Sequence, residues 1–366
     1  MRRNLFLALF FAILFTLAYS VNAIELSAKG AVLLEADSGD IVFGKNENER
    51  LPMASTTKIM TALVVLERVS LDTVVTIQPF MTGIEGSSIY LHEGEELTVE
   101  ELLYALMLES ANDASVALAY TVADSIEEFA DLMNKRAVQL GLTDTHFSNP
   151  HGLDDKEHYT TAYELAVITR EAMKNPKFEE IVSTYKKTIP LNNGEGARVL
   201  VNHNRLLRSY EGAIGVKTGF TKRCGRCLVS CAVLDGVKMI CVTLNAPNDW
   251  SDHASMLDLG FSQYRCIKLA DKNDYNIRFD AINGVTGSFI ASNRDSLSVT
   301  IKNDDNNISA KLESSRIFFA PIKKGDLVAK IVFYNGEREL ASLPLYACES
   351  IDGIKYKKSI FERLFG

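Results

Sequence analysis

The sequence predicts an α+β fold in which helices flank an antiparallel sheet, followed by a small all-β domain. Residues 28–36 and 40–45 are strand-like and are joined by a short polar turn. Residues 227–234 and 237–244 form a second strand pair around Asp235-Gly236, a hairpin signal. Helical patterns fill the chain between the two pairs. We therefore expect the first and last strands to be neighbours in one sheet covered by helices.

The helical region contains one break that we expect to matter for function. Thr98 and Glu101 have the spacing of a capping box and begin an apolar helical face. Ser110 and Asn112 follow that helix, and a second apolar helix begins around Ala114. Small polar side chains at a break between two apolar helices are expected to project into a cleft instead of a core.

We expect the first domain to comprise residues 24–262. Residues 267–350 differ from it in composition. Helical periodicity is absent, and Asn, Asp and Gly separate short alternating segments at 275–279, 296–301, 308–312 and 327–334. This pattern is typical of an all-β domain, and we expect a sandwich. The domain contains no cluster of His, Cys and carboxylate residues, so we assign it no chemistry.

The composition is that of a globular protein with about two domains. The chain has 366 residues, of which 47% are apolar and 23% are charged. Its formal net charge is −8, and it has no polybasic run of the length expected for a nucleic-acid patch. Both observations argue against nucleic acid as a partner.

Residues 1–23 have the pattern of a signal peptide. Two arginines precede an almost wholly apolar segment, residues 5–18, and Val21-Asn22-Ala23 is a small-x-small cleavage site. We expect cleavage there and an exported, extracytoplasmic protein at the cell wall or the outer face of the cytoplasmic membrane. An uncleaved anchor is the alternative, although the apolar run is short for a full span.

The cysteines all lie in the later part of the chain, at Cys224, Cys227, Cys231, Cys241, Cys266 and Cys348. An even number in an exported protein permits disulfides without establishing them. Cys224 and Cys227 have zinc-ligand spacing, but no second pair completes a site, so we expect no metal and no other cofactor. Cys227, Cys231 and Cys241 lie in apolar stretches, and we interpret them as buried thiols.

Residues 351–366 form a basic tail. Four basic residues accompany apolar side chains that fall on one side of a helix, Ile360, Phe361, Leu364 and Phe365. A basic amphipathic segment is typical of a peripheral membrane contact. Docking of the tail on the all-β domain explains the same pattern equally well, and both interpretations stay open.

Ser55 and Lys58 are the first candidates for chemistry. They precede an apolar helical segment, so we expect Ser55 near a helix N-terminus with Lys58 on the same face. A serine needs a neighbouring base to act as a nucleophile, and a lysine kept neutral can be that base. By itself the motif is weak, because an N-capping serine followed by a solvated lysine has the same sequence.

Two more segments turn this weak motif into a constellation. Ser110-x-Asn112 and Lys217-Thr218-Gly219 follow Ser55-x-x-Lys58 in that order along the chain. The three motifs together are the known signature of penicillin-binding proteins and class A β-lactamases. Each motif is common alone, whereas the ordered combination is specific.

The residue types in these motifs have clear chemical roles. Lys217 is expected to depress the pKa of Lys58 by like-charge repulsion, and with Thr218 to hold a substrate carboxylate. Ser110 would relay a proton to the leaving amine. Asn112 would donate to the substrate amide carbonyl and orient Lys58.

The oxyanion site is expected from backbone groups. The N–H groups of Ser55 and Phe220 would together bind the developing negative charge on the attacked carbonyl oxygen.

The chain resembles the serine-type D-alanyl-D-alanine carboxypeptidases, the low-molecular-mass penicillin-binding proteins of the peptidase S11-like family. The resemblance covers about residues 25–350. Family-like blocks are Met53–Lys58, Gly86–Leu91, Ser110–Ala114, Asn149–Leu153 and Val216–Thr221. One departure is Ala111, which stands where a glycine is frequent, and another is a tail that is short for a full amphipathic anchor.

This resemblance implies both a fold and an activity. The fold is a penicillin-binding/β-lactamase-like transpeptidase domain with a β-rich second domain that leads to a membrane-associated helix. The activity is removal of the terminal D-alanine from peptidoglycan pentapeptides through an acyl-enzyme on Ser55, with inhibition by β-lactam antibiotics.

Two alternatives to the carboxypeptidase share part of the pattern. A class A β-lactamase has the same three motifs, but it needs a Glu-x-x-x-Asn deacylation element between Ser110 and Lys217, and no such element occurs in a fitting context. A penicilloyl-binding sensor would be acylated without turnover, but such sensors usually follow several transmembrane segments. Signatures of zinc peptidases and of Ser-His-Asp hydrolases are absent from the sequence.

Overall fold

The computed structural model describes residues 24–354, so the predicted signal peptide and tail residues 355–366 lie outside the described residues. The chain divides into two compact units, the first ending at Gly260 and the second beginning at Phe261. Residues 235–237, in the turn between two strands of the first sheet, cluster with the second unit. No helix within residues 24–354 is long and apolar enough to cross a bilayer.

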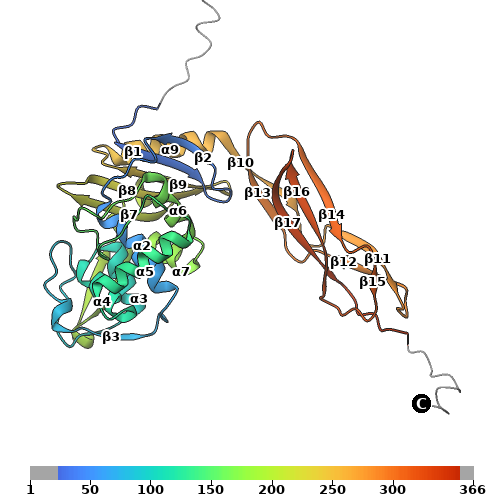
Figure 1. Ribbon diagram of the computed structural model, residues 1–366, viewed down its shortest axis with the longest axis horizontal. Helices are drawn as coiled ribbons and strands as arrows, with labels where there is room; N and C mark the ends of the chain where they lie inside the picture. The colour runs from blue at the N-terminus through green and yellow to red at the C-terminus, as the bar shows by residue number, and fades with distance from the viewer. Residues whose placement is uncertain (1–23, 355–366) are drawn as a thin grey trace, which may run out of the picture. The chain divides into compact units, whose positions relative to one another are not determined.

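A five-stranded sheet in the order β2-β1-β9-β8-β7 organises the first unit (Figure 1). The strands are β1 Gly30–Glu35, β2 Ile41–Lys45, β7 Ala213–Thr221, β8 Gly225–Leu234 and β9 Val237–Leu244. β1 pairs with β9 in antiparallel register, which confirms the expected contact between the first and last strands.

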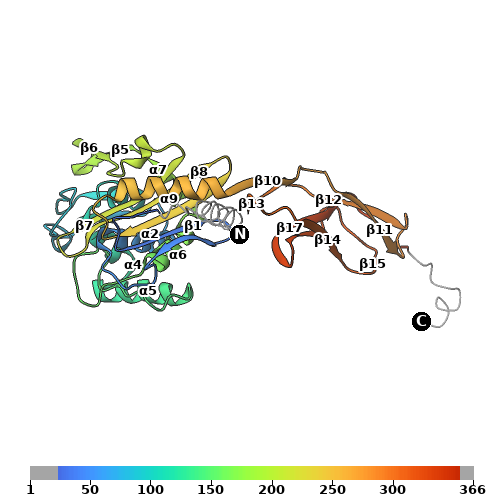
Figure 2. The ribbon, with the colours of Figure 1, turned by 90° about the horizontal axis from the view of Figure 1, so that it is seen from above.

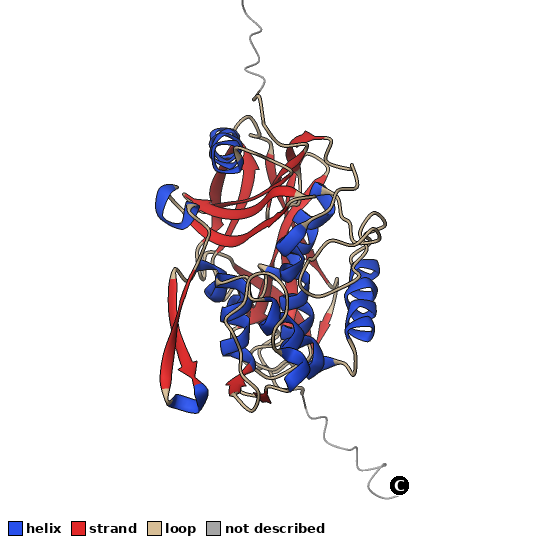
Figure 3. Cartoon of the chain, turned by 90° about the vertical axis from the view of Figure 1, so that its left-hand side faces the viewer, coloured by secondary structure: helices blue, strands red, loops and turns tan. Residues whose placement is uncertain are grey.

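Strand β1 is buried on both faces, which explains its continuous apolar sequence. Val32 and Leu34 belong to the main apolar core, on the side of the sheet where most helices pack. Leu33 faces the other side and lies close to Gly260 of helix α9. Figures 1 and 3 show α9 on one face of the sheet and most of the remaining helices on the other.

The helices of the first unit are α2 Lys58–Leu66, α3 Val99–Leu108, α4 Asn112–Val122, α5 Ile126–Gln139, α6 Ala162–Ala172, α7 Pro176–Ser183, α8 Leu206–Ser209 and α9 Asp249–Gln263. Helices α3 to α7 surround α2, which carries the candidate lysine. Eight of the nine residues of α2 are buried. Because α2 is buried on all sides and mostly apolar, it lies at the centre of the unit.

The break between α3 and α4 is sharper than the sequence suggested. The predicted capping box is confirmed, since Thr98 and Glu101 exchange hydrogen bonds at the start of α3. Helix α4 begins at Asn112, two residues before the predicted start at Ala114. The turn is made at Ser110, whose φ of 59° is in the left-handed region that a non-glycine residue rarely adopts.

Shorter strands complete the first unit. β3 Val74–Thr76 pairs with β4 Glu96–Thr98, and β5 Lys186–Leu191 pairs with β6 Gly196–Val201. The β5–β6 hairpin, which projects from the unit in Figures 2 and 3, was not predicted. Its burial pattern is irregular and it contains Pro190, so it lacks the alternation that marks a half-buried strand.

The second unit is all-β, as predicted. Its strands are β10 Tyr264–Ala270, β11 Asn276–Ile282, β12 Ser288–Ser292, β13 Leu297–Lys302, β14 Ile308–Ser314, β15 Phe318–Phe319, β16 Leu327–Asn335 and β17 Arg338–Ala347. Six of them form a sheet in the order β14-β16-β17-β12-β11-β15, and β10 pairs with β13. The rings of Phe279, Phe289 and Phe318 pack together in its core.

Candidate active site

Ser55 lies in a tight 3-10 turn, Ala54–Thr57, immediately before α2. The prediction that Ser55 lies near a helix N-terminus is confirmed, with this turn between Ser55 and the α-helix. The turn is held by two threonine hydroxyls, because Thr56 Oγ1 donates to Met53 O at 2.6 Å and Thr57 Oγ1 donates to Ala54 O at 2.8 Å. Ala54 has a φ of 47°, which turns the chain so that Ser55 faces a cavity.

Lys58 Nζ has three oxygen neighbours in the buried interior. It lies 3.1 Å from Ser55 Oγ, 2.7 Å from Asn112 Oδ1 and 2.6 Å from the carbonyl oxygen of His151. The oxygens of Asn112 and His151 can only accept hydrogen bonds. A neutral amine has two N–H groups for these two acceptors, and its lone pair then faces the hydroxyl of Ser55. The geometry therefore fits a general base.

The orientation of the Asn112 side chain follows from its other contacts. Its Nδ2 donates to the carbonyl oxygen of Glu85 at 2.6 Å, so its Oδ1 must face Lys58. Its backbone N–H donates to the carbonyl oxygen of Ser87 at 2.7 Å. A Cβ on Gly86 would lie 2.7 Å from Asn112 Nδ2, which requires glycine at this position. The loop around Gly86 thus fixes Asn112.

Burial is the main reason for the low pKa of Lys58. Its side chain has no exposed surface, and burial lowers its pKa well below the usual range. The positive charge of Lys217 lowers that pKa further, as the sequence suggested, but it is the second cause in size. Asp113 opposes both effects. The pKa of Lys217 is lowered to about 7, again by burial, against the opposing effect of Glu109.

Strand β7 runs directly beside the nucleophile. A Cβ on Gly219 would lie 3.1 Å from the backbone nitrogens of both Ser55 and Thr56. Those contacts are to backbone and tighter than most Cβ contacts, so any larger residue would push the strand slightly away from Ser55, and glycine allows this close approach. The approach places the amide of Ser55 next to the backbone of β7, where the sequence predicts the oxyanion site.

A cavity of about 460 Å³ connects the predicted residues. Of the predicted residues, it is lined by Ser55, Ser110, Thr218, Gly219 and Phe220. The other three predicted residues, Lys58, Asn112 and Lys217, are buried.

Ser110 is buried and lies at the wall of this cavity. Within the described part of the chain, its hydroxyl has no hydrogen-bond partner, so it is available to a bound molecule. Lys217 Nζ donates to the carbonyl oxygen of its neighbour Thr218 at 2.9 Å.

Two histidines that the sequence analysis did not assign support the nucleophile turn. His151 supplies its carbonyl oxygen to Lys58. His158 Nδ1 accepts from the backbone N–H of Ser148 at 3.0 Å, so its Nε2 carries the proton and donates to Thr57 Oγ1 at 2.7 Å. The family-like block at residues 149–153 was the only sequence signal near these two histidines. The role of His151 could not be predicted, because a backbone carbonyl has no sequence signature.

The same cavity extends past an aromatic and two arginines. The guanidinium groups of Arg205 and Arg226 lie 5.9 and 5.6 Å from the ring centroid of Trp250, and Arg226 pairs with Asp249 at 3.0 Å. These residues also line an adjoining cavity of about 820 Å³. No motif in the sequence indicated them.

The cysteines do not form a site in this structure. All six are free thiols, and Cys227, Cys231 and Cys241 are buried, which confirms their interpretation. Burial raises the pKa of Cys227 and Cys231 to about 12, so both thiols stay protonated. Within residues 24–354, no group of three or more His, Cys, Asp or Glu side chains is placed to hold a metal ion.

An antiparallel sheet with flanking helices, a serine beside a buried lysine and a Lys-Thr-Gly strand next to them define the class of penicillin-binding serine enzymes. The model of the peptidase S11 family, described as D-alanyl-D-alanine carboxypeptidase, matches residues 17–248. That of the C-terminal domain of penicillin-binding protein 5 matches residues 265–352. The chain belongs to the D-alanyl-D-alanine carboxypeptidase family, and the resemblance inferred from its motifs is confirmed.

Curated relatives and solved structures agree with this family. D-alanyl-D-alanine carboxypeptidase DacF of Bacillus subtilis is 35% identical over 334 residues, covering 88% of this chain and 86% of its own. DacC of Escherichia coli is 30% identical, covering 95% of this chain and 90% of its own. Penicillin-binding protein 5 of Haemophilus influenzae has a TM-score of 0.67 at 26% identity, with 91% and 100% covered. DacD of Francisella tularensis has a TM-score of 0.65 at 28% identity, with 90% and 95% covered.

Proposed function

We propose that this protein hydrolyses the terminal D-Ala-D-Ala bond of peptidoglycan stem pentapeptides through an acyl-enzyme on Ser55. The reaction releases D-alanine and limits cross-linking, and β-lactams acylate the same serine. One observation carries the proposal: Lys58 has two obligate acceptors, Asn112 Oδ1 and His151 O, and its third neighbour is the hydroxyl of Ser55. The family membership supports it independently.

Acylation begins with proton transfer from Ser55 Oγ to the neutral amine of Lys58. The oxygen attacks the carbonyl carbon of the penultimate D-alanine, and the backbone N–H groups of Ser55 and Phe220 bind the resulting oxyanion. Ser110 then relays a proton to the leaving nitrogen as the C–N bond breaks. D-alanine departs, and water hydrolyses the ester of Ser55.

Recognition of the substrate's free carboxylate is assigned to Lys217 and Thr218. Thr218 lines the cavity beside Ser55, and Lys217 is the buried cation next to it. Asn112 has the further role of holding the amide carbonyl of the stem peptide. The sequence relatives favour this carboxypeptidase over a β-lactamase or a non-turnover sensor, and we propose neither alternative.

Substitution of Ser55 tests the proposal. Ser55→Ala is expected to abolish both penicillin labelling and D-alanine release from a diacyl-Lys-D-Ala-D-Ala peptide. Thermal unfolding of the variant, compared with the wild type, shows that the fold is intact. Release of D-alanine by the pure, folded variant would refute Ser55 as the nucleophile.

Export and domain division belong to the same proposal. We assign residues 1–23 to a signal peptide, 24–262 to the catalytic domain, 267–350 to the all-β domain and 351–366 to a basic tail. The protein then acts outside the cytoplasmic membrane, where peptidoglycan is located. The N-terminal sequence of the mature protein tests the cleavage, which should leave Ile24 first.

A further inference from the structure

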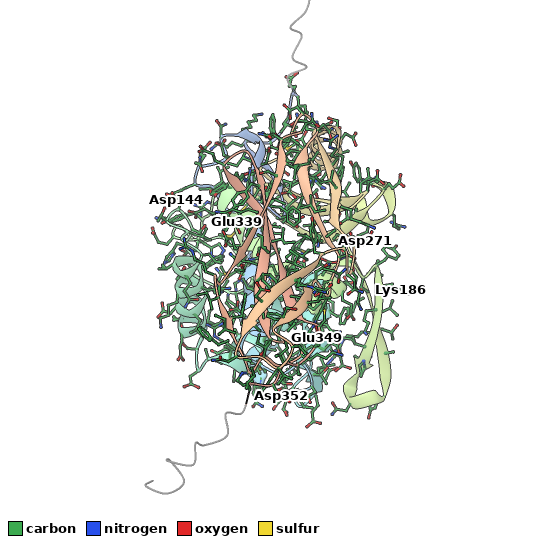
Figure 4. All side chains as sticks on the ribbon, turned by 90° about the vertical axis from the view of Figure 1, so that its right-hand side faces the viewer. Asp144, Lys186, Asp271, Glu339, Glu349 and Asp352 are labelled. Carbon is green, nitrogen blue, oxygen red and sulfur yellow. The ribbon has the colours of Figure 1, made fainter. Side chains whose placement is uncertain are left out.

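A second cavity adjoins the active-site cavity in the first unit. Its volume is about 820 Å³, and it shares four lining residues with the active-site cavity: Arg205, Arg226, Asp249 and Trp250. Cavities of roughly 300–1,000 Å³ enclose most of a drug-sized ligand. The second unit presents its acidic side chains differently. Those that Figure 4 labels there are exposed and lie apart from one another, so they enclose no common site: Asp271, Glu339, Glu349 and Asp352.

The walls of the second cavity come from segments that are distant in the sequence. They are residues 25–27, Arg205 before α8, Arg226 of β8 and residues 247–252 at the start of α9. The first and last of these segments are fixed to each other. Asp252 accepts the backbone N–H of Ser27 at 3.1 Å and its hydroxyl at 2.7 Å. That hydroxyl in turn accepts from the backbone N–H of Asn248 at 2.9 Å, so hydrogen bonds hold this wall in place.

Two charged side chains of the second cavity are free to meet a ligand. Arg226 pairs with Asp249 at 3.0 Å, and the carboxylate of Asp252 is taken up by Ser27. Within residues 24–354, neither Arg205 nor Glu25 forms an ion pair, and both are exposed. The cavity therefore offers one unpaired cation next to the active site and one unpaired anion in the segment of residues 25–27.

The charges of the active-site cavity indicate which end of the substrate lies toward the second cavity. In the proposed reaction, the leaving residue carries the free carboxylate of the substrate. Lys217 is buried and does not line the active-site cavity, whereas Arg205 and Arg226 do, on either side of the Trp250 ring. The anionic leaving residue is therefore attracted toward Trp250. The side chain of D-alanine is only a methyl group, so it leaves the second cavity unused, whereas a longer side chain at the same position extends into it.

We propose that the second cavity is a subsite for the side chain of the leaving residue. On this basis the protein also cleaves a D-alanyl bond whose leaving D-amino acid carries a peptide on its side chain, as in a cross-link between two stem peptides. This inference rests on the proposed function, because the chemistry is the same. The ester forms on Ser55, the C–N bond breaks, Ser110 passes a proton to the leaving nitrogen, and water hydrolyses the ester. Only the leaving group is larger.

Two peptides with the same acyl part test the proposal on the mature protein. One is diacyl-Lys-D-Ala-D-Ala. In the other, the leaving residue is a D-lysine whose side-chain amine carries an acylated dipeptide, and its α-carboxylate stays free. The wild type is expected to cleave this branched peptide with a kcat/KM at least equal to that for the D-alanine peptide.

A substitution that fills the second cavity makes the test specific. Ser251 is exposed and lines the second cavity but not the active-site cavity. In Ser251→Trp, the indole ring takes up space that the branched side chain needs. The ratio of kcat/KM for the branched peptide to that for the D-alanine peptide should fall by about tenfold or more, because the binding energy of the side chain is lost.

Ser255→Trp is the matched control. Ser255 is the same residue type one turn further along α9, is exposed and lines neither cavity. Its ratio should equal that of the wild type. The inference is overturned, and the proposed function stands, if the wild type cleaves only the D-alanine peptide, if Ser251→Trp keeps the wild-type ratio or if both variants lower it equally. Cleavage of neither peptide by the wild type would overturn the proposed function and this inference with it.

Discussion

The carbonyl oxygen of His151 accepts a hydrogen bond from Lys58 Nζ at 2.6 Å. This contact joins the loop before α6 to the buried lysine of α2. A carbonyl oxygen cannot donate, so it fixes the direction of one N–H group of the lysine. With Asn112 accepting a second N–H, the electron pair of a neutral Lys58 has one remaining direction, toward Ser55.

A charged acceptor at position 112 is expected to inactivate the base. In the wild type, the amide oxygen of Asn112 lies 2.7 Å from Lys58 Nζ. In Asn112→Asp, a carboxylate would take its place and would raise the pKa of the buried lysine. Acylation at neutral pH should fall by about 100-fold or more, because general-base catalysis typically contributes that much. The rate of acylation by a β-lactam, measured against pH, should recover only at higher pH.

Asn112→Ala is the control for this change. It removes the acceptor without adding a charge. The rate of acylation should therefore fall, while the ascending limb of the pH profile should not move to higher pH. If the Asp and Ala variants have the same pH profile, the charge state of Lys58 does not control acylation.

The pKa of Lys217 predicts the alkaline side of the peptide reaction. Burial lowers that pKa to about 7, so Lys217 loses its charge as the pH rises through this value. Glu109 opposes the shift. Its replacement by glutamine should lower the pKa of Lys217 further and move the loss of kcat/KM for a peptide with a free carboxylate to lower pH.

The glutamine at position 109 can still accept from the backbone N–H of Val201, as Glu109 does at 2.6 Å, while the contact of the second carboxylate oxygen with His203 Nε2, at 2.9 Å, becomes a contact with a neutral amide. Glu100→Gln, which removes a surface ion pair with Lys177, should leave the pH profile in place. An unchanged profile in Glu109→Gln would show that Lys217 does not bind the carboxylate as a cation.

Two buried histidines, His158 and His253, and the partly buried His151 predict instability in acid. Burial lowers the pKa of His151 and His253 to about 3 and that of His158 to about 4, from 6.5. Below pH 6.5 the unfolded chain binds protons that the folded chain does not. The contribution of these histidines to the free energy of unfolding is therefore fully present above about pH 6.5. It is lost as the pH falls toward 4, by up to about 4 kcal/mol per pH unit for three groups.

Urea unfolding of the first unit between pH 7 and pH 4 measures this slope. His253 lies between the hydroxyls of Ser230 and Thr243 and is remote from Lys58 in the hydrogen-bond network. In His253→Gln one titrating group is removed. The slope of the free energy of unfolding against pH should therefore fall by about one third, whatever the variant's stability at pH 7. Equal slopes in variant and wild type would contradict the assignment.

The sequence was sufficient to predict which side chains meet, because the motifs specify side-chain chemistry. Ser55, Lys58 and Asn112 are joined by hydrogen bonds, and Ser110 and Thr218 line the same cavity. What it did not predict depends on backbone. The carbonyl of His151 and the left-handed turn at Ser110 arise from tertiary packing and have no residue-type signature.

The fold shows the same division. Strands with clear apolar patterns, β1 and β9, were predicted together with their pairing. The β5–β6 hairpin was missed, since its residues are mostly exposed or half-exposed and neither face is consistently apolar. Trp250 and its two arginines were missed for another reason. Their neighbourhood is created by the approach of β8, α9 and the residue that precedes α8, which no local pattern encodes.

The His158–Thr57 hydrogen bond predicts a positioning role for a residue that does not touch substrate. Thr57 Oγ1 accepts from His158 and donates to the carbonyl oxygen of Ala54, the residue before the nucleophile. Thr57→Val keeps the shape but leaves both partners unsatisfied, at a cost of about 1–3 kcal/mol each. We expect acylation of Ser55 to slow by about tenfold or more, because the turn that holds it is no longer fixed.

Thr56→Val separates this effect from a general loss of stability. Thr56 is equally buried, and its hydroxyl donates to the carbonyl oxygen of Met53 in the same manner, but it has no histidine partner. Both variants should lose stability in urea, whereas only Thr57→Val should slow acylation beyond what its stability explains. If Thr56→Val and Thr57→Val slow acylation equally, the connection to His158 has no positioning role, and the hydroxyls matter only as local supports of the turn.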